Sequence, residues 1–430
     1  MAMGEDPLGT LLSSVESRLF SVATPEKDDD NSISSFGNIR QIVKHSFFAL
    51  FICASADIFA GISLAKMAYI LSLYPGLVVL IPGIMGMRGS IFGSFVARLG
   101  TGLHTGEVSP PFKSSEPLLQ QIRGVAAQTL AISLVLALAV KGFGFVAGLE
   151  MMSLQRLIVI SALSGILSGA LLLAFVLVVI LKSFRAGIDP DNISVPLITA
   201  TCDVITIPIL FASAVAVSAL SESLTLFFSL GLIVLTSVAA AYSLYAGSPH
   251  LARIFRQSFP VLVICSAVST VAGTFMGLEI DMLVAWTAML LLIPVFNAEG
   301  GNLGGILSSR LSSAYHLGIT KMGKRPDELT EKNFSSILLL SLLIFPVLGI
   351  FAQIVSMAFG FSSPGFWKVL LICAVAGFSI TAFTITITYY LTYFTVKIGI
   401  DPDNVVVPII TSIIDVLGTG TLILVTVLMI

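Results

Sequence analysis

The stretch Ile188-Asp189-Pro190-Asp191-Asn192 recurs 212 residues later as Ile400-Asp401-Pro402-Asp403-Asn404. The same offset aligns the chain with itself from about residue 46 to residue 206 without a net gap. Beyond this stretch the matches include Pro196, Thr199, Asp203 and Val204, which recur as Pro408, Thr411, Asp415 and Val416. A constant offset over this length indicates two copies of one structural unit.

The sequence as a whole is too apolar for a water-soluble protein. Of the 430 residues, 56% are hydrophobic and only 11% are charged, and the mean hydropathy is +1.02. Soluble domains usually carry about 25% charged residues. The formal charge of −2 and the lack of a Lys/Arg-rich run exclude nucleic acid as a partner. The composition predicts a polytopic membrane protein, with the lipid bilayer as a partner.

Eleven segments are long and apolar enough to cross a bilayer, since a spanning helix needs about 20 apolar residues. They lie near 45–66, 72–97, 124–148, 157–181, 192–218, 223–246, 258–278, 282–308, 334–360, 367–394 and 404–430. The predicted fold is all-α, with two parallel five-helix repeats joined by an extra transmembrane helix. The expected parts are a disordered cytoplasmic arm (1–44), the first repeat (45–220), the linking helix (221–250) and the second repeat (251–430).

The basic residues predict the orientation of these spans. With a cytoplasmic N-terminus, most of the 22 Lys and Arg fall in cytoplasmic segments, as the positive-inside rule requires. The exceptions are Lys66, Lys141, Arg156 and Lys368, which would lie outside, and Arg88, which lies within a span. Because each repeat has five spans, the extra span between them makes the copies parallel, with a pseudo-twofold axis along the membrane normal. We expect a multi-pass cell-membrane protein with an external C-terminus, and a monomer because the duplication replaces a dimer.

Ionisable residues deep in a span are functional hypotheses by default, because a charge there costs about 2.5–3.5 kcal/mol. Five residues qualify: Asp57, Arg88, Asp203, Glu299 and Asp415. Four of these are acidic and one is basic, which favours a cation as the ligand.

Two of the acids end a polar stripe on the fifth span of each repeat. Asn192, Pro196, Thr199 and Asp203 are separated by steps of 4, 3 and 4 residues, which keeps them on one helical face. Asp189-Pro190 fits a capping residue followed by proline at the first helical position. At ~1.5 Å per residue, Asp203 lies roughly 16 Å below Asn192, about halfway through a ~30 Å hydrocarbon core. Asn404 and Asp415 repeat this arrangement in the second copy, at the same depths.

Two facing carboxylates at this depth need a positive charge between them. A divalent cation with its water shell meets that need, because hard ions such as Mg²⁺ take oxygen ligands and keep several waters. Thr199 and Thr411, one turn away from the acids, can bond that water shell. The alternative is that Arg88 or a backbone group satisfies each aspartate in a packed core.

The second spans differ between the copies. In the second copy, Asn297, Glu299 and Asn302 follow a proline within a glycine-rich segment. Glycines allow close helix approach or a local break whose carbonyls face an ion pathway, so these three residues are further metal candidates. Repeat-related positions carry different residues: Asp57 matches Ser269, Arg88 matches Gly300 and Glu299 matches Met87. We expect a structural ion pair between Asp57 and Arg88 rather than a gating pair. The candidates for gating or coupling are Asp57, Arg88, Asn192 and Asn404.

Together these motifs resemble the membrane domain of MgtE-type magnesium transporters, in the duplicated form of their eukaryotic solute-carrier and archaeal relatives. The resemblance rests on Gly300-Gly301-Asn302, on the following Ser309-Arg310-Leu311-Ser312 and Ala97-Arg98-Leu99-Gly100, and on the fifth-span pattern. It implies that an acid of the fifth helix from each half lines the central pore and holds hydrated Mg²⁺, a role that falls on Asp203 and Asp415. The sequence departs from the family in lacking a preceding CBS-type sensor, and in having Ser90 where the second copy has Asn302.

Three functions follow from these observations. The first is a transporter or channel for a divalent metal cation, Mg²⁺ by expectation, with no enzymatic activity and no cofactor apart from the transported ion. The second is an exchanger coupled to Na⁺ or H⁺, because Asp57 and Glu299 break the symmetry in a way that a passive pore does not require. The remote third is an intramembrane aspartyl protease, which also uses two membrane aspartates. Neither Asp203 nor Asp415 has the Gly-x-Gly-Asp context of such proteases.

Overall fold

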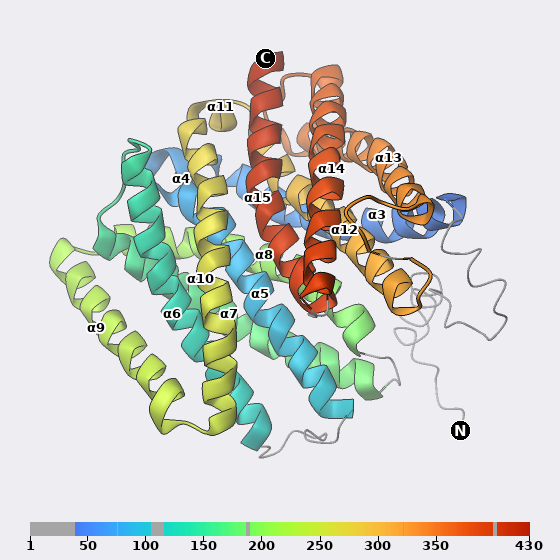
Figure 1. Cartoon of the computed structure of the whole chain (residues 1–430). Coiled ribbons are helices and arrows are strands. Elements are labelled where there is room, and N and C mark those ends of the chain that lie inside the picture. The colour runs from blue at the N-terminus through green and yellow to red at the C-terminus, as the bar shows by residue number, and fades with distance from the viewer. Residues whose placement is uncertain (1–38, 75, 105–115, 186–189, 321, 399–401) are drawn as a thin grey trace, which may run out of the picture.

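The computed structural model describes residues 39–74, 76–104, 116–185, 190–320, 322–398 and 402–430 (Figure 1). Eleven long helices in this part of the chain are apolar enough to span a membrane, and these residues form no strand. In chain order they are α3 (Ile39–Lys66), α5 (Leu77–His104), α6 (Glu116–Val146), α7 (Leu154–Arg185), α8 (Pro190–Ser218), α9 (Glu222–Ala241), α10 (Pro249–Leu278), α12 (Thr287–His316), α13 (Glu328–Phe359), α14 (Phe366–Lys397) and α15 (Pro402–Met429). The predicted fold class is therefore confirmed.

The fifth helix of each repeat begins where the sequence predicts. Helices α8 and α15 start at Pro190 and Pro402, since proline at the first helical position loses no hydrogen bond and has its φ already set. The expected capping residues, Asp189 and Asp401, lie outside the described residues. The predicted arm at 1–44 lies outside them up to residue 38, and α3 already begins at Ile39.

Two short helices were not predicted. Helix α4 (Ala68–Leu73) follows α3 and helix α11 (Ile280–Ala285) follows α10, so they keep the offset of the repeat. They contact each other and lead the chain from the first span into the second span of each copy. Six residues are too few to show a helical period in the sequence, so the sequence predicts no separate helix at either place.

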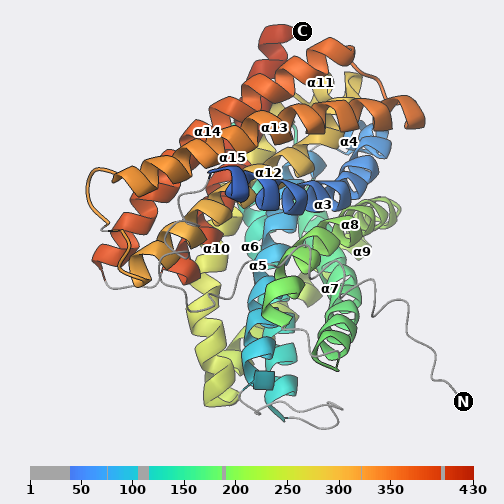
Figure 2. The same ribbon diagram turned by 90° about the vertical axis from the view of Figure 1, so that its right-hand side faces the viewer.

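The first span of each repeat packs against the second span of the other repeat. Helix α3 lies along α12, as Figure 2 shows, and α10 lies along α5 (Figure 1). A Cβ atom on Gly61 would overlap the carbonyl oxygen of Leu291, and a Cβ atom on Gly273 would overlap that of Val79. These two contacts are repeat-related, so the same close backbone approach occurs twice.

This exchange divides the molecule into two packed halves that differ from the sequence repeats. One half consists of α5 to α10, and the other consists of α3 with α12 to α15. The main contacts between them are α3 with α8 and α10 with α15, which we call the seam. The fifth helices, which carry Asp203 and Asp415, therefore both lie at the seam. One apolar core cluster contains side chains of both halves, and a second lies within the half formed by α5 to α10.

Alanine at Gly61 should destabilise the protein. The added methyl group meets backbone rather than a flexible side chain, so the two helices must separate, and such overpacking costs about 1–3 kcal/mol. The midpoint of thermal unfolding of the purified chain in detergent measures this effect. The control is Gly93→Ala on α5, where no atom lies within 4 Å of the new Cβ and the midpoint should stay equal or rise. Equal midpoints for the two variants would contradict the close approach.

Candidate functional site

Asp203 on α8 and Asp415 on α15 lie close enough for their carboxylates to interact electrostatically. Both residues are half-buried. They come from repeat-related positions on opposite halves of the molecule, so the seam brings two like charges toward each other. A cation is the ligand that such a pair favours.

Asp415 is held by residues of the other half. The Ser269 hydroxyl on α10 donates a hydrogen bond of 3.1 Å to Asp415 Oδ2. A Cβ atom on Gly86 of α5 would lie 3.6 Å from the same oxygen, so glycine there leaves the carboxylate uncovered on that side. Three helices, α15, α10 and α5, therefore meet at this carboxylate.

The residue beside Asp203 is an acid, whereas the repeat-related residue beside Asp415 carries a hydroxyl. Asp57, the repeat-related counterpart of Ser269, lies on α3 and interacts electrostatically with Asp203. Asp57 is buried, with 4% of its surface exposed, and it also interacts with Glu299 of α12. The four acids therefore form a connected series, from Glu299 through Asp57 and Asp203 to Asp415.

The described residues contain no group of three or more His, Cys, Asp or Glu side chains close enough to hold a bare metal ion. Two carboxylates alone leave most coordination positions of a metal to water. Mg²⁺ commonly binds in this way, through one or two carboxylates and several waters.

Glu299 is fully buried at the contact of α12 with α3. The Asn302 side chain donates a hydrogen bond of 3.5 Å to Glu299 Oε1, and Glu299 Oε2 has no partner among the described atoms. The thiol of Cys53 lies beside both Glu299 and Asp57. Asn302 and Glu299 thus belong to one local polar group, one helical turn apart.

Asn297 ties α12 to α15. Its Nδ2 donates to the backbone carbonyl of Asp415 at 3.4 Å and to Thr419 Oγ1 at 2.8 Å, and a Cβ atom on Gly418 would overlap its Oδ1. The donor group of this amide therefore fixes the helical turn that carries Asp415. The sequence singled out Asn297 as a metal candidate but gave no sign of this contact.

The remaining candidates lie on the fifth helices. Thr411 lies one turn before Asp415, and a Cβ atom on Gly301 of α12 would contact its methyl group at 3.2 Å. The side chains of Thr199, Asn192 and Asn404 lie outside the described residues.

The expected ion pair between Asp57 and Arg88 is wrong. Arg88 is fully buried, but its Nη1 donates to Thr129 Oγ1 of α6 at 3.2 Å, while its Nε and Nη2 have no hydrogen-bond partner among the described atoms. The guanidinium points from α5 toward α6 and α7, because Gly165 of α7 leaves room for it. Asp57 lies on α3 at the seam, against different helices.

The second repeat fills the equivalent space with a phenyl ring. Gly377, the counterpart of Gly165, lies directly against the ring of Phe345, and Phe345 is the counterpart of Ser133. The first repeat therefore has a large residue at Arg88 and a small one at Ser133. The second repeat has a small residue at the matching Gly300 and a large one at the matching Phe345. This reciprocal exchange of a large and a small side chain is visible in the aligned repeats, but only the structure shows that Arg88 and Ser133 both border Gly165.

We expect positions 88 and 133 to be energetically coupled. A Phe introduced at Ser133 collides with the guanidinium, whereas in an Arg88→Gly background it fills the vacated space as Phe345 does. The double variant should be more stable than the sum of the single effects predicts, by roughly 0.5–3 kcal/mol. A double-mutant cycle on unfolding of the purified chain measures this, and additive effects would refute the exchange.

The comparisons with known proteins agree with this arrangement. The family model MgtE, described as a divalent cation transporter, matches residues 81–213 and 293–425, which differ by the offset of the repeat and cover more than half of the chain. Among relatives, mouse solute carrier family 41 member 3 is 24% identical over 367 residues, covering 80% of this chain and 74% of that protein. Chicken solute carrier family 41 member 2 is 25% identical over 366 residues, covering 80% of this chain and 62% of that protein.

Human solute carrier family 41 member 2 is 24% identical over 364 residues, covering 80% of this chain and 62% of that protein. No solved structure matches the chain. Two copies of the family's domain, which together cover more than half of the chain, lead to one assignment. The chain belongs to the MgtE family of divalent cation transporters.

Proposed function

We propose that the chain moves Mg²⁺, or a related divalent cation, through the seam, and that Asp203 and Asp415 hold the hydrated ion there. One observation carries this proposal: two carboxylates from repeat-related positions interact across the seam. No ion pair with a basic side chain relieves either of them in the described part of the chain. The family's description as a divalent cation transporter supports the class of ion.

The proposed mechanism uses the water shell of the ion. Each carboxylate accepts hydrogen bonds from waters that remain on the metal, so the ion needs no dedicated cage and can leave the site again. Ser269 fixes the orientation of the Asp415 carboxylate through its hydrogen bond, and Asn297 fixes the turn that carries it. The metal is the cargo in this scheme. We assign the chain no catalytic residue and no cofactor.

We further propose that one chain forms the whole pathway in the membrane. The seam takes α8 and α10 from one half and α3 and α15 from the other, so both walls come from the same polypeptide. The distribution of Lys and Arg supports a cytoplasmic N-terminus and an external C-terminus. A single copy in the membrane is then sufficient for transport.

Coupled exchange is the second candidate mechanism. The observation that favours it is the buried pair of Asp57 and Glu299, which places additional acid beside Asp203 but not beside Asp415. An exchanger needs a place for a coupling ion, either H⁺ or Na⁺, and a simple pore does not. Metal uptake that collapses when the gradient of that ion is removed distinguishes exchange from conduction.

Asp203→Asn and Asp415→Asn should each reduce metal flux into proteoliposomes by at least about tenfold. Either substitution leaves a doubly charged ion half compensated, while the amide keeps the size of the side chain. Mg²⁺, Mn²⁺, Co²⁺ and Ca²⁺ should be compared in the same assay. The control is Asp281→Asn on α11, an exposed acid away from the seam. Undiminished flux in both seam variants would remove the proposed site.

A further inference from the structure

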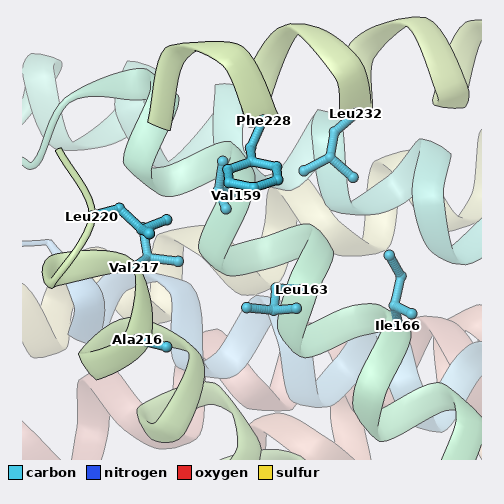
Figure 3. A pocket seen from close by; sticks show the side chains of 8 residues that line it. All are labelled: Val159, Leu163, Ile166, Ala216, Val217, Leu220, Phe228 and Leu232. Atoms are coloured by element: carbon cyan, nitrogen blue, oxygen red, sulfur yellow. The ribbon is translucent and has the colours of Figure 1, made fainter. Parts of the chain in front are cut away.

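A cavity lies away from the seam, between α7, α8 and α9 (Figure 3). Its volume is about 340 Å³, and its lining is apolar throughout. The lining residues are Val159, Leu163 and Ile166 of α7, Ala216 and Val217 of α8, Leu220 of the connection to α9, and Phe228 and Leu232 of α9. Figure 3 shows these side chains facing the space between the three helices.

The cavity depends on the linking helix. Helix α9 has no counterpart in the aligned repeats, and it lies at the edge of the molecule in Figure 1. Its main contacts are with α6 and α7, which leaves the space toward α8 unfilled by protein. The side chains of Phe228 and Ile166 remain 46% and 42% exposed, so the cavity opens onto the surface that faces the bilayer.

The cavity also has a definite depth. Leu220 lies between the end of α8 and the start of α9, and Val159 lies five residues after the first residue of α7. At ~1.5 Å per residue, the cavity begins within roughly 8 Å of these helix ends and continues inward along α7. The cavity therefore lies near the ends of all three helices.

A basic residue lies on α7 about one helical turn before the cavity. Arg156 precedes Val159, Leu163 and Ile166 by steps of 3, 4 and 3 residues, which places it on the same face of α7 at the membrane end. No described carboxylate forms an ion pair with it. A guanidinium binds phosphate oxygens through paired N–H groups. An apolar cavity with a guanidinium one helical turn beyond it, on the same helical face, therefore fits a ligand with an acyl chain and a phosphate.

We propose that this cavity is a phospholipid site, with one acyl chain inside it and the lipid phosphate on Arg156. At about 30 Å³ for a water-sized group, the cavity takes roughly ten methylene groups, and the rest of the chain continues into the bilayer. The bound acyl chain fills the space between α8 and α9 and contacts both helices. It thereby fastens the linking helix to the half formed by α5 to α10.

The test is the phospholipid content of the intact chain. The protein is reconstituted into vesicles of phosphatidylglycerol and phosphatidylcholine, extracted in detergent and examined by native mass spectrometry. One phospholipid per chain is expected on the unmodified protein. Ala216→Trp fills the cavity, and Arg156→Gln removes the proposed phosphate contact near the start of α7, so each should lower the fraction carrying lipid by about tenfold.

Two matched controls separate this site from general lipid contact. Val178→Trp adds the same ring to an exposed part of α7 outside the cavity. Lys368→Gln removes the repeat-related basic residue of α14. Both controls should keep the lipid. Unchanged lipid content in Ala216→Trp and Arg156→Gln would overturn the proposal, as would a second copy of the chain, a sterol or detergent bound at the cavity in place of phospholipid.

Discussion

The repulsion between two carboxylates in a poorly polar environment is the constraint on which the rest of this structure depends. Asp203 and Asp415 approach each other because the fifth helices lie at the seam, and those helices are fixed by the exchanged first spans. A pair of like charges taken out of water is costly unless a counter-charge compensates it. In the proposed function, the free energy of this pair falls when a cation arrives between the two carboxylates. We regard this preorganised repulsion as the source of ion affinity in the proposed function.

Duplication within one chain allows the two sides of the seam to differ. Ser269 supports Asp415 with a neutral hydroxyl, whereas Asp57 places another acid beside Asp203. A dimer of identical subunits would have to carry the same residue at both positions. The same freedom explains Arg88, whose guanidinium occupies in one repeat the space that Phe345 fills in the other. Such differences supply the chemical asymmetry that a coupled mechanism requires, while the backbone stays symmetric.

Much of the fold was predictable from the sequence because it depends on composition and period. The spans follow from apolar length, the repeats follow from the offset between Asp203 and Asp415, and the helix starts follow from Pro190 and Pro402. Hydropathy does not indicate which helix is the neighbour of which. The exchange of the first spans therefore stayed hidden, although Gly61 and Gly273 marked the close contact.

The candidate site was predictable to a smaller extent. The buried acids stood out because ionisable residues are rare in spans, but the direction in which a side chain leaves its helix is not encoded in spacing along one helix. Arg88 therefore points to α6 and α7 instead of Asp57, and Asn297 binds the backbone of α15. The error on Arg88 comes from neighbours on other helices, and so does the unforeseen contact of Asn297, whose role as a metal ligand stays a prediction.

A structure of the chain loaded with Mn²⁺, with the metal located by its anomalous scattering, tests the central claim most directly. The account predicts one peak between the carboxylates of Asp203 and Asp415, at a distance from both that leaves room for water. A peak beside Glu299 alone, or no peak at the seam in a protein that transports Mn²⁺, would contradict it.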